Sequence, residues 1–108
     1  MDVSDGPIPG ECSGWKAWHD HEPPGPETLK VTGECKFPTP GYKVELRRHE
    51  PQGTYPENLL LERIVKEPEG QPRVITTELV RYEEETDVEY VTVTILSDGV
   101  TVLVDHPS

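Results

Sequence analysis

The sequence predicts an all-β fold, a small antiparallel β-sandwich of immunoglobulin-like type with about six strands. Apolar and polar residues alternate over several segments, no comparable stretch has helical period, and turn signals recur about every 8–12 residues. At 108 residues the chain is long enough for one domain with a modest core. We therefore expect an irregular N-terminal arm over residues 1–27, packed on the core, and a single β-sandwich domain over residues 28–108.

The pattern of residues 91–104 predicts that this segment forms a β-hairpin. Their alternating apolar residues run into Asp98 and Gly99 and then resume with the same parity. An Asp-Gly pair favours a two-residue type I′ turn, and closure there would set Ile95 opposite Val102. One face of the hairpin would then be apolar, and the other would carry threonines.

Four further strands are predicted from alternating or β-branched residues. They span Thr28–Phe37 and residues 42–48, 59–65 and 74–82, the last with room to continue into the acidic run that follows it. The turn between the first two is either a tight hairpin or a corner between two sheets, because a tight hairpin would set Glu34 opposite Glu45. Residues 49–58 form the longest internal loop, and such loops are often functional.

The N-terminal arm is predicted from its composition. Residues 1–27 contain five prolines and four glycines, which interrupt both helices and sheet ladders. Trp15, Ala17 and Trp18 form an apolar cluster within it. We expect a tryptophan to anchor the arm across the core, with room for a short strand around residues 15–19.

The charge balance excludes some partners. Ten Lys and Arg residues stand against 21 Asp and Glu residues, a formal net charge of −11, which repels nucleic-acid phosphates and anionic membrane surfaces. No apolar run approaches the roughly 18 residues of a spanning helix. Residues 1–7 lack the basic start and apolar run of a secretory signal, so we expect a soluble cytoplasmic protein, or a secreted one if the chain has been processed.

Two cysteines leave two alternatives open. Cys12 and Cys35 either form a disulfide that staples the arm to the first strong strand, or remain reduced, with Cys35 facing the core as a small apolar side chain.

Residues 18–22, Trp-His-Asp-His-Glu, are the densest group of potential metal ligands. On an extended backbone His19 and His21 share one face, and zinc, nickel or copper would accept their nitrogens if a third ligand came from elsewhere. His49, His106 or a carboxylate are the candidates for that ligand. The alternative is a polar arm whose histidines meet solvent or nearby carboxylates.

The only basic cluster opens the long loop. Arginine and aromatic residues are enriched in protein-binding surfaces, so this loop and the tryptophan-bearing arm predict a protein or peptide partner. The residues of this predicted partner surface are Arg47, Arg48, His49, Tyr55, Trp15 and Trp18. The alternative is local ion pairing of the arginines with the many glutamates.

Constellations typical of catalysis are absent from the sequence. It has no G-x-S-x-G elbow and no phosphate-binding glycine loop, and neither cysteine stands in the context of a known nucleophile. The sequence therefore favours a non-enzymatic interaction module with no required cofactor. The alternatives are a metal-binding protein using His19 and His21, and a structural subunit of a larger assembly.

One short segment resembles a known pattern. Residues 38–46, Pro-Thr-Pro-Gly-Tyr-Lys-Val-Glu-Leu, resemble the T-G-G-Y-x-V-x-I strand entry of small bacterial β-domains associated with protease complexes, with Pro40 in place of a glycine. The resemblance covers nine residues, and it implies a bacterial β-sandwich that acts by binding a partner and not by catalysis.

Overall fold

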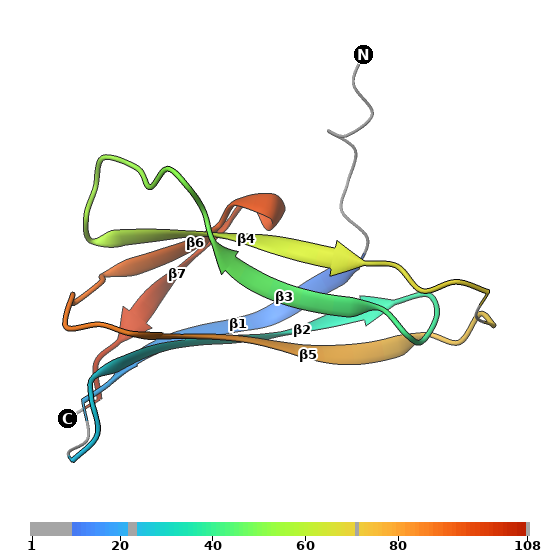
Figure 1. Cartoon of the computed structure of the whole chain (residues 1–108), viewed down its shortest axis with the longest axis horizontal. Helices are drawn as coiled ribbons and strands as arrows, with labels where there is room; N and C mark the ends of the chain where they lie inside the picture. The colour runs from blue at the N-terminus through green and yellow to red at the C-terminus, as the bar shows by residue number, and fades with distance from the viewer. Residues whose placement is uncertain (1–9, 22–23, 71, 108) are drawn as a thin grey trace.

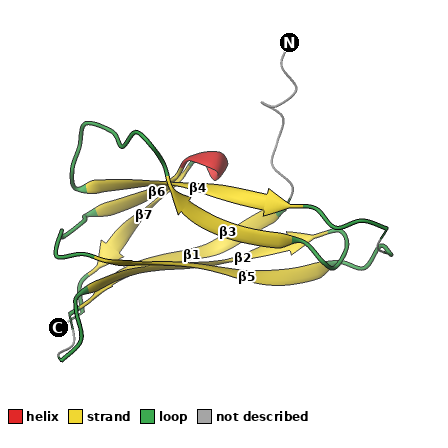
Figure 2. Ribbon diagram, viewed as in Figure 1, coloured by secondary structure: helices red, strands yellow, loops and turns green. Residues whose placement is uncertain are grey.

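The computed structural model describes residues 10–21, 24–70 and 72–107, and they form an all-β chain. Seven strands make one mixed sheet that curls nearly into a barrel (Figure 1). The strands are β1 (Glu11–Asp20), β2 (Thr28–Phe37), β3 (Lys43–Arg48), β4 (Asn58–Lys66), β5 (Thr76–Glu85), β6 (Thr92–Ile95) and β7 (Val100–Asp105). A short 3-10 helix, η2 (Leu96–Asp98), joins β6 to β7 and is the red turn in Figure 2.

The strand order is β3-β4-β6-β7-β1-β2-β5. In Figure 1, β3, β4 and β6 lie on one side, β1, β2 and β5 lie on the other, and β7 crosses between them. The pairs β1–β7 and β4–β6 are parallel, whereas the other pairs are antiparallel. The predicted all-β class is confirmed. The prediction of about six strands in a purely antiparallel arrangement is wrong, and the predicted immunoglobulin-like sandwich is not confirmed.

The irregular arm predicted over residues 1–27 is not confirmed, because β1 occupies its middle. This strand pairs with β2 from Glu11 opposite Lys36 to Asp20 opposite Thr28, with a register shift between Ser13 and Lys16. The prolines of this region fall before and after β1, so the composition of the whole segment concealed a strand. Residues 1–9 and 22–23 lie outside the described residues.

The turn after β2 is a corner within one sheet: of the two alternatives that the sequence left open, the tight hairpin is wrong, and two separate sheets do not form. Strand β2 pairs with β1 and β5, whereas β3 pairs with β4, so Glu34 and Glu45 are not cross-strand neighbours. The rings of Phe37 and Tyr42 stack across this corner with centroids 4.5 Å apart. The like-charge argument against a tight hairpin therefore holds.

The β6–β7 hairpin is confirmed, but its predicted turn is wrong. Ile95 pairs with Val100 instead of Val102, so four residues form the loop. A type I′ turn needs two residues with positive φ, and here only Gly99 has one, at 65°. Its N–H donates to the carbonyl of Leu96 at 3.2 Å, which closes the 3-10 turn instead. The predicted faces hold, because Ile95 is buried and Thr94 points outward to bond Thr101.

Alternate residues of the strands fill the interior. The largest fully buried apolar side chains are Phe37, Leu29, Leu59, Leu61, Ile95, Val31 and Val93. Trp15 packs over Gly33, where an added Cβ would lie 2.4 Å from the indole ring. The aromatic anchor that the sequence predicted therefore lies against the core, placed there by a strand.

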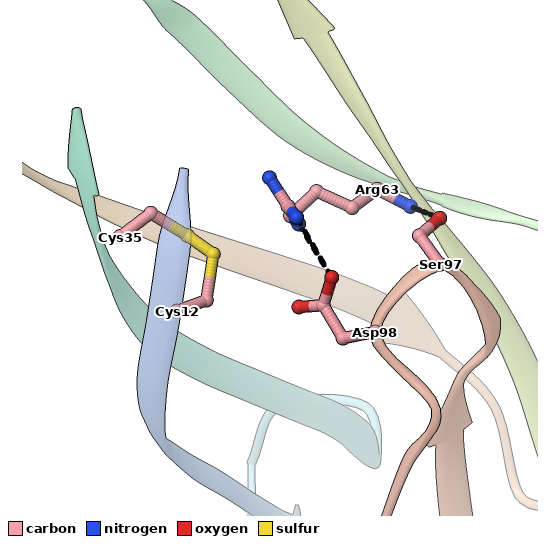
Figure 3. Close-up of a disulfide and its surroundings, with 5 residues drawn as sticks. All are labelled: Cys12, Cys35, Arg63, Ser97 and Asp98. Carbon is pink, nitrogen blue, oxygen red and sulfur yellow. Dashed lines mark hydrogen bonds and ion pairs between the residues drawn. A yellow bond between two sulfur atoms is a disulfide. The ribbon is translucent and has the colours of Figure 1, made fainter. Parts of the chain in front are cut away.

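A disulfide and a buried ion pair lie at one end of the interior (Figure 3). Cys12 and Cys35 stand opposite each other on β1 and β2 and are joined by a disulfide, which decides between the two alternatives. Arg63 of β4 is 4% exposed and its guanidinium donates to Asp98 at 2.7 and 3.0 Å. The N–H of Arg63 donates to the hydroxyl of Ser97, so these contacts fix the β6–β7 loop against β4.

Candidate metal centre

Parallel pairing of β1 and β7 brings three histidines to one edge of the molecule. Ala17 is paired with Val104 and Trp18 with Asp105, so the next step of the same register sets His19 beside His106. His21 follows β1 by one residue. Because parallel strands end at the same edge, two segments far apart in the sequence deliver their imidazoles together.

The three imidazoles converge. One potential ligand atom from each of His19, His21 and His106 lies within 4.8 Å of the others. Nε2 of His21 is 3.4 Å from Nδ1 of His106. The rings of His19 and His21 stack with centroids 4.3 Å apart, as expected for neighbours on one face of an extended strand.

Glu27, in the connection from β1 to β2, lies against two of these histidines. Its Oε1 is 2.8 Å from Nδ1 of His21 and 3.2 Å from Nε2 of His19. The main-chain carbonyl of Glu27 accepts a bond from the N–H of Thr86 at 3.1 Å, just after β5. The carboxylate is therefore held beside the cluster by the backbone of the sheet.

His19 is the buried member of the cluster, with no exposed side-chain surface. Neither of its ring nitrogens makes a hydrogen bond among the described residues, since the 3.2 Å approach of Glu27 lacks hydrogen-bond geometry. A buried polar group without a partner costs about 1–3 kcal/mol. Such a group needs an explanation, and a bound ion is one.

His106 is fixed from its other side. Its Nε2 lies 3.1 Å from the main-chain oxygen of Tyr90, and a carbonyl can only accept, so Nε2 is the donor. The phenol of Tyr90 lies in a further network with Arg48 and Glu84. The carbonyl that orients His106 therefore belongs to an anchored residue.

The structure selects among the third ligands that the sequence offered. His106 joins His19 and His21, and Glu27 is the neighbouring carboxylate. His49 lies outside this cluster, where its Nδ1 is 3.0 Å from Glu62 on β4. No pattern in the sequence singles out Glu27 among 21 acidic residues, apart from its closeness to His21 in the chain.

The predicted partner surface is not assembled as one patch, because Arg48, whose side chain is 39% exposed, is bonded to other residues of the chain. Its Nη1 donates to Glu84 at 3.1 Å and to the hydroxyl of Tyr90 at 3.2 Å, which links the two end strands β3 and β5. The bond to Tyr90 raises the pKa of Arg48 above its ordinary value. Burial raises the pKa values of Tyr82 and Tyr90. The structure therefore shows the alternative for Arg48, which is local ion pairing with a glutamate.

The other residues of the predicted surface are dispersed. Trp15 is partly buried against the core, and it lines an outer groove of about 540 Å³ together with Trp18 and Leu103. Arg47 and Tyr55 are exposed, Tyr55 by 74%. The loop that carries Tyr55 is held by Gln52, whose side chain forms hydrogen bonds with the main chain of His49 and Leu60.

Comparison with family models, with curated proteins and with solved structures gave no match. No helix among the described residues is long and apolar enough to cross a membrane.

Proposed function

We propose that this protein binds a divalent transition-metal ion, with zinc as the reference case, through His19, His21 and His106. The observation that carries the proposal is the convergence of three imidazoles from two separate segments, one of them buried without a hydrogen-bond partner among the described residues. A cation would satisfy the buried ring, and three imidazoles form a donor set that such ions accept.

The spacing of the nitrogens suits such an ion. Two nitrogens that each lie about 2.0–2.1 Å from a tetrahedral ion are about 3.3–3.4 Å apart. Nε2 of His21 and Nδ1 of His106 are 3.4 Å apart, whereas the widest separation in the set is below 4.8 Å. Rotation of the imidazole of His19 toward the other two would complete a three-nitrogen site.

Charge and ligand chemistry favour a borderline cation over a hard one. The formal net charge of −11 draws cations toward the protein. Calcium and magnesium prefer sites made of oxygen atoms, whereas imidazoles suit zinc, nickel and copper. The disulfide of Cys12 with Cys35 removes both thiols as ligands and favours action in an oxidising compartment, in place of the cytoplasm.

The interaction module and the absence of enzymatic activity stay predictions. Exposed Arg47 and Tyr55 are the members of the predicted surface that support a protein or peptide partner. Arg48 is bonded to Glu84 and Trp15 packs on the core, so these two residues have contacts within the fold as well. The histidine cluster is the more specific feature, and it makes metal binding the better supported function.

Isothermal titration of tag-free protein with zinc tests this proposal. We expect one ion per chain, and His106→Ala should weaken binding by more than the roughly 10–100-fold loss typical of an outer-shell change. His106 is the variant of choice because it is exposed, so its loss should leave the fold intact. His49→Ala is the matched control and should bind as the wild type does. Equal zinc binding by wild type and His106→Ala, or none by wild type, would overturn the proposal.

A further inference from the structure

The two nitrogens of His21 have different environments. Nδ1 lies 2.8 Å from Oε1 of Glu27, while Nε2 faces His106. An ionised carboxylate can only accept a hydrogen bond, so a proton on Nδ1 of His21 is the one that Glu27 would stabilise. The nitrogen of His21 left to bind an ion is then Nε2.

His106 has the opposite arrangement. Its Nε2 donates to the carbonyl of Tyr90, which leaves the lone pair on Nδ1. That carbonyl is well placed for the task, because Tyr90 is 5% exposed and its phenol is bonded by Arg48 and Glu84. The backbone therefore orients Nε2 of His106, while the carboxylate of Glu27 faces Nδ1 of His21.

These two contacts leave Nε2 of His21 and Nδ1 of His106 facing each other at 3.4 Å, within hydrogen-bond distance. A proton can bridge two such nitrogens, and a cation that both rings coordinate would take the place of that proton. We propose that Glu27 is a positioning residue that does not bind the ion, so that His21 coordinates through Nε2 and His106 through Nδ1. This inference rests on the metal site proposed above and assigns its geometry.

The same oxygen of Glu27 also faces His19. The distance from Oε1 to Nε2 of His19 is 3.2 Å, so one carboxylate lies between two imidazoles of the set. Hydrogen bonds from outer carboxylates to metal-binding histidines fix the ring orientation and raise the basicity of the ligand. With Glu27 in that role, the fourth position of a tetrahedral ion is left to water.

Long-range proton–nitrogen NMR of histidine-labelled protein tests the assignment at mildly alkaline pH, where a free imidazole is neutral. In the metal-free protein we expect His21 protonated on Nδ1 and His106 protonated on Nε2. Zinc should then move the resonances of Nε2 of His21 and Nδ1 of His106. Glu27→Gln should weaken zinc binding by about 10–100-fold and mix the tautomers of His21. Glu45→Gln, on exposed β3, removes the same charge and should change neither.

The outcomes separate this inference from the proposed function. Zinc bound through Nδ1 of His21 would overturn the inference and leave the metal site standing. So would a Glu27→Gln variant that binds zinc as weakly as His106→Ala while His21 keeps its wild-type tautomer, because Glu27 would then be a ligand. Absence of any zinc-induced change in the wild type would overturn both.

Discussion

Nε2 of His21 lies 3.4 Å from Nδ1 of His106, although 85 residues separate them in the chain. The parallel pair of β1 and β7 makes this possible, and in the described part of those strands that pair rests on Ala17 with Val104 and Trp18 with Asp105. An ion held between the two histidines would therefore tie together the ends of a short strand pairing. Metal binding and fold stability should be coupled at this edge.

That coupling predicts a thermal shift. Zinc at 100 times its dissociation constant should add about 2.7 kcal/mol to the free energy of unfolding. For a chain of this size the melting temperature should rise by roughly 10 °C, measured by differential scanning calorimetry. His49→Ala should keep the shift, because His49 contacts Glu62 and not the cluster. A shift of the same size in His106→Ala would place the stabilising ion elsewhere.

Gly33→Ala should destabilise the fold. The added methyl carbon would lie 2.4 Å from a ring atom of Trp15, whose indole is wedged against the core. Overpacking of this kind costs about 1–3 kcal/mol, which denaturant unfolding measures. Gly25→Ala is the control, since nothing lies within 4 Å of the added carbon there and its stability should match the wild type. Equal stability of the two variants would show that Trp15 does not pack on Gly33.

Reduction of the disulfide should lower stability. Cys12 and Cys35 are 23 residues apart, and closing a loop of that length in the unfolded chain is worth about 3 kcal/mol in the chain-entropy description. Thermal unfolding with and without a phosphine reductant measures the difference, and a thiol assay confirms that the bond is broken. An unchanged melting temperature in protein with two free thiols would contradict this role.

Stability should fall at alkaline pH through Tyr82. Burial raises the pKa of this phenol above its ordinary value of 10.0, so the unfolded chain ionises before the folded one. The contribution of Tyr82 to the free energy of unfolding is complete below pH 10, and it is lost as the pH rises through the higher pKa of the folded state. Denaturant unfolding between about pH 8 and pH 12 should show the gap between wild type and Tyr82→Phe shrinking above pH 10.

Tyr55→Phe is the control for that series. Tyr55 is 74% exposed, so its removal should leave the pH dependence of the unfolding free energy as in the wild type. If the gap for Tyr82→Phe stayed constant across the series, the phenol would not be shielded by the fold.

Local patterns predicted the strands well and their partners poorly. Thr28–Phe37 was predicted with its observed bounds, because period-two alternation is written within the segment. The parallel pairs β1–β7 and β4–β6 join segments distant in the chain, and no local pattern encodes such pairing. Strand β1 was concealed because prolines on both sides of it dominated the composition of its surroundings.

Part of the candidate site could be predicted from the sequence. The shared face of His19 and His21 follows from their spacing, but the choice of His106 over His49 depends on the parallel register that the sequence did not reveal. Arg48 was predicted as a partner-binding residue because its type is common at interfaces. In the fold it bonds Glu84 across the gap between the end strands, a contact that requires the curl of the sheet.

The most direct measurement is the anomalous diffraction of crystals grown with zinc, recorded on both sides of the zinc absorption edge. The account predicts one strong peak about 2.0–2.1 Å from a ring nitrogen of each of His19, His21 and His106. A peak at any other place, or none at the three histidines at full zinc occupancy in solution, would contradict it.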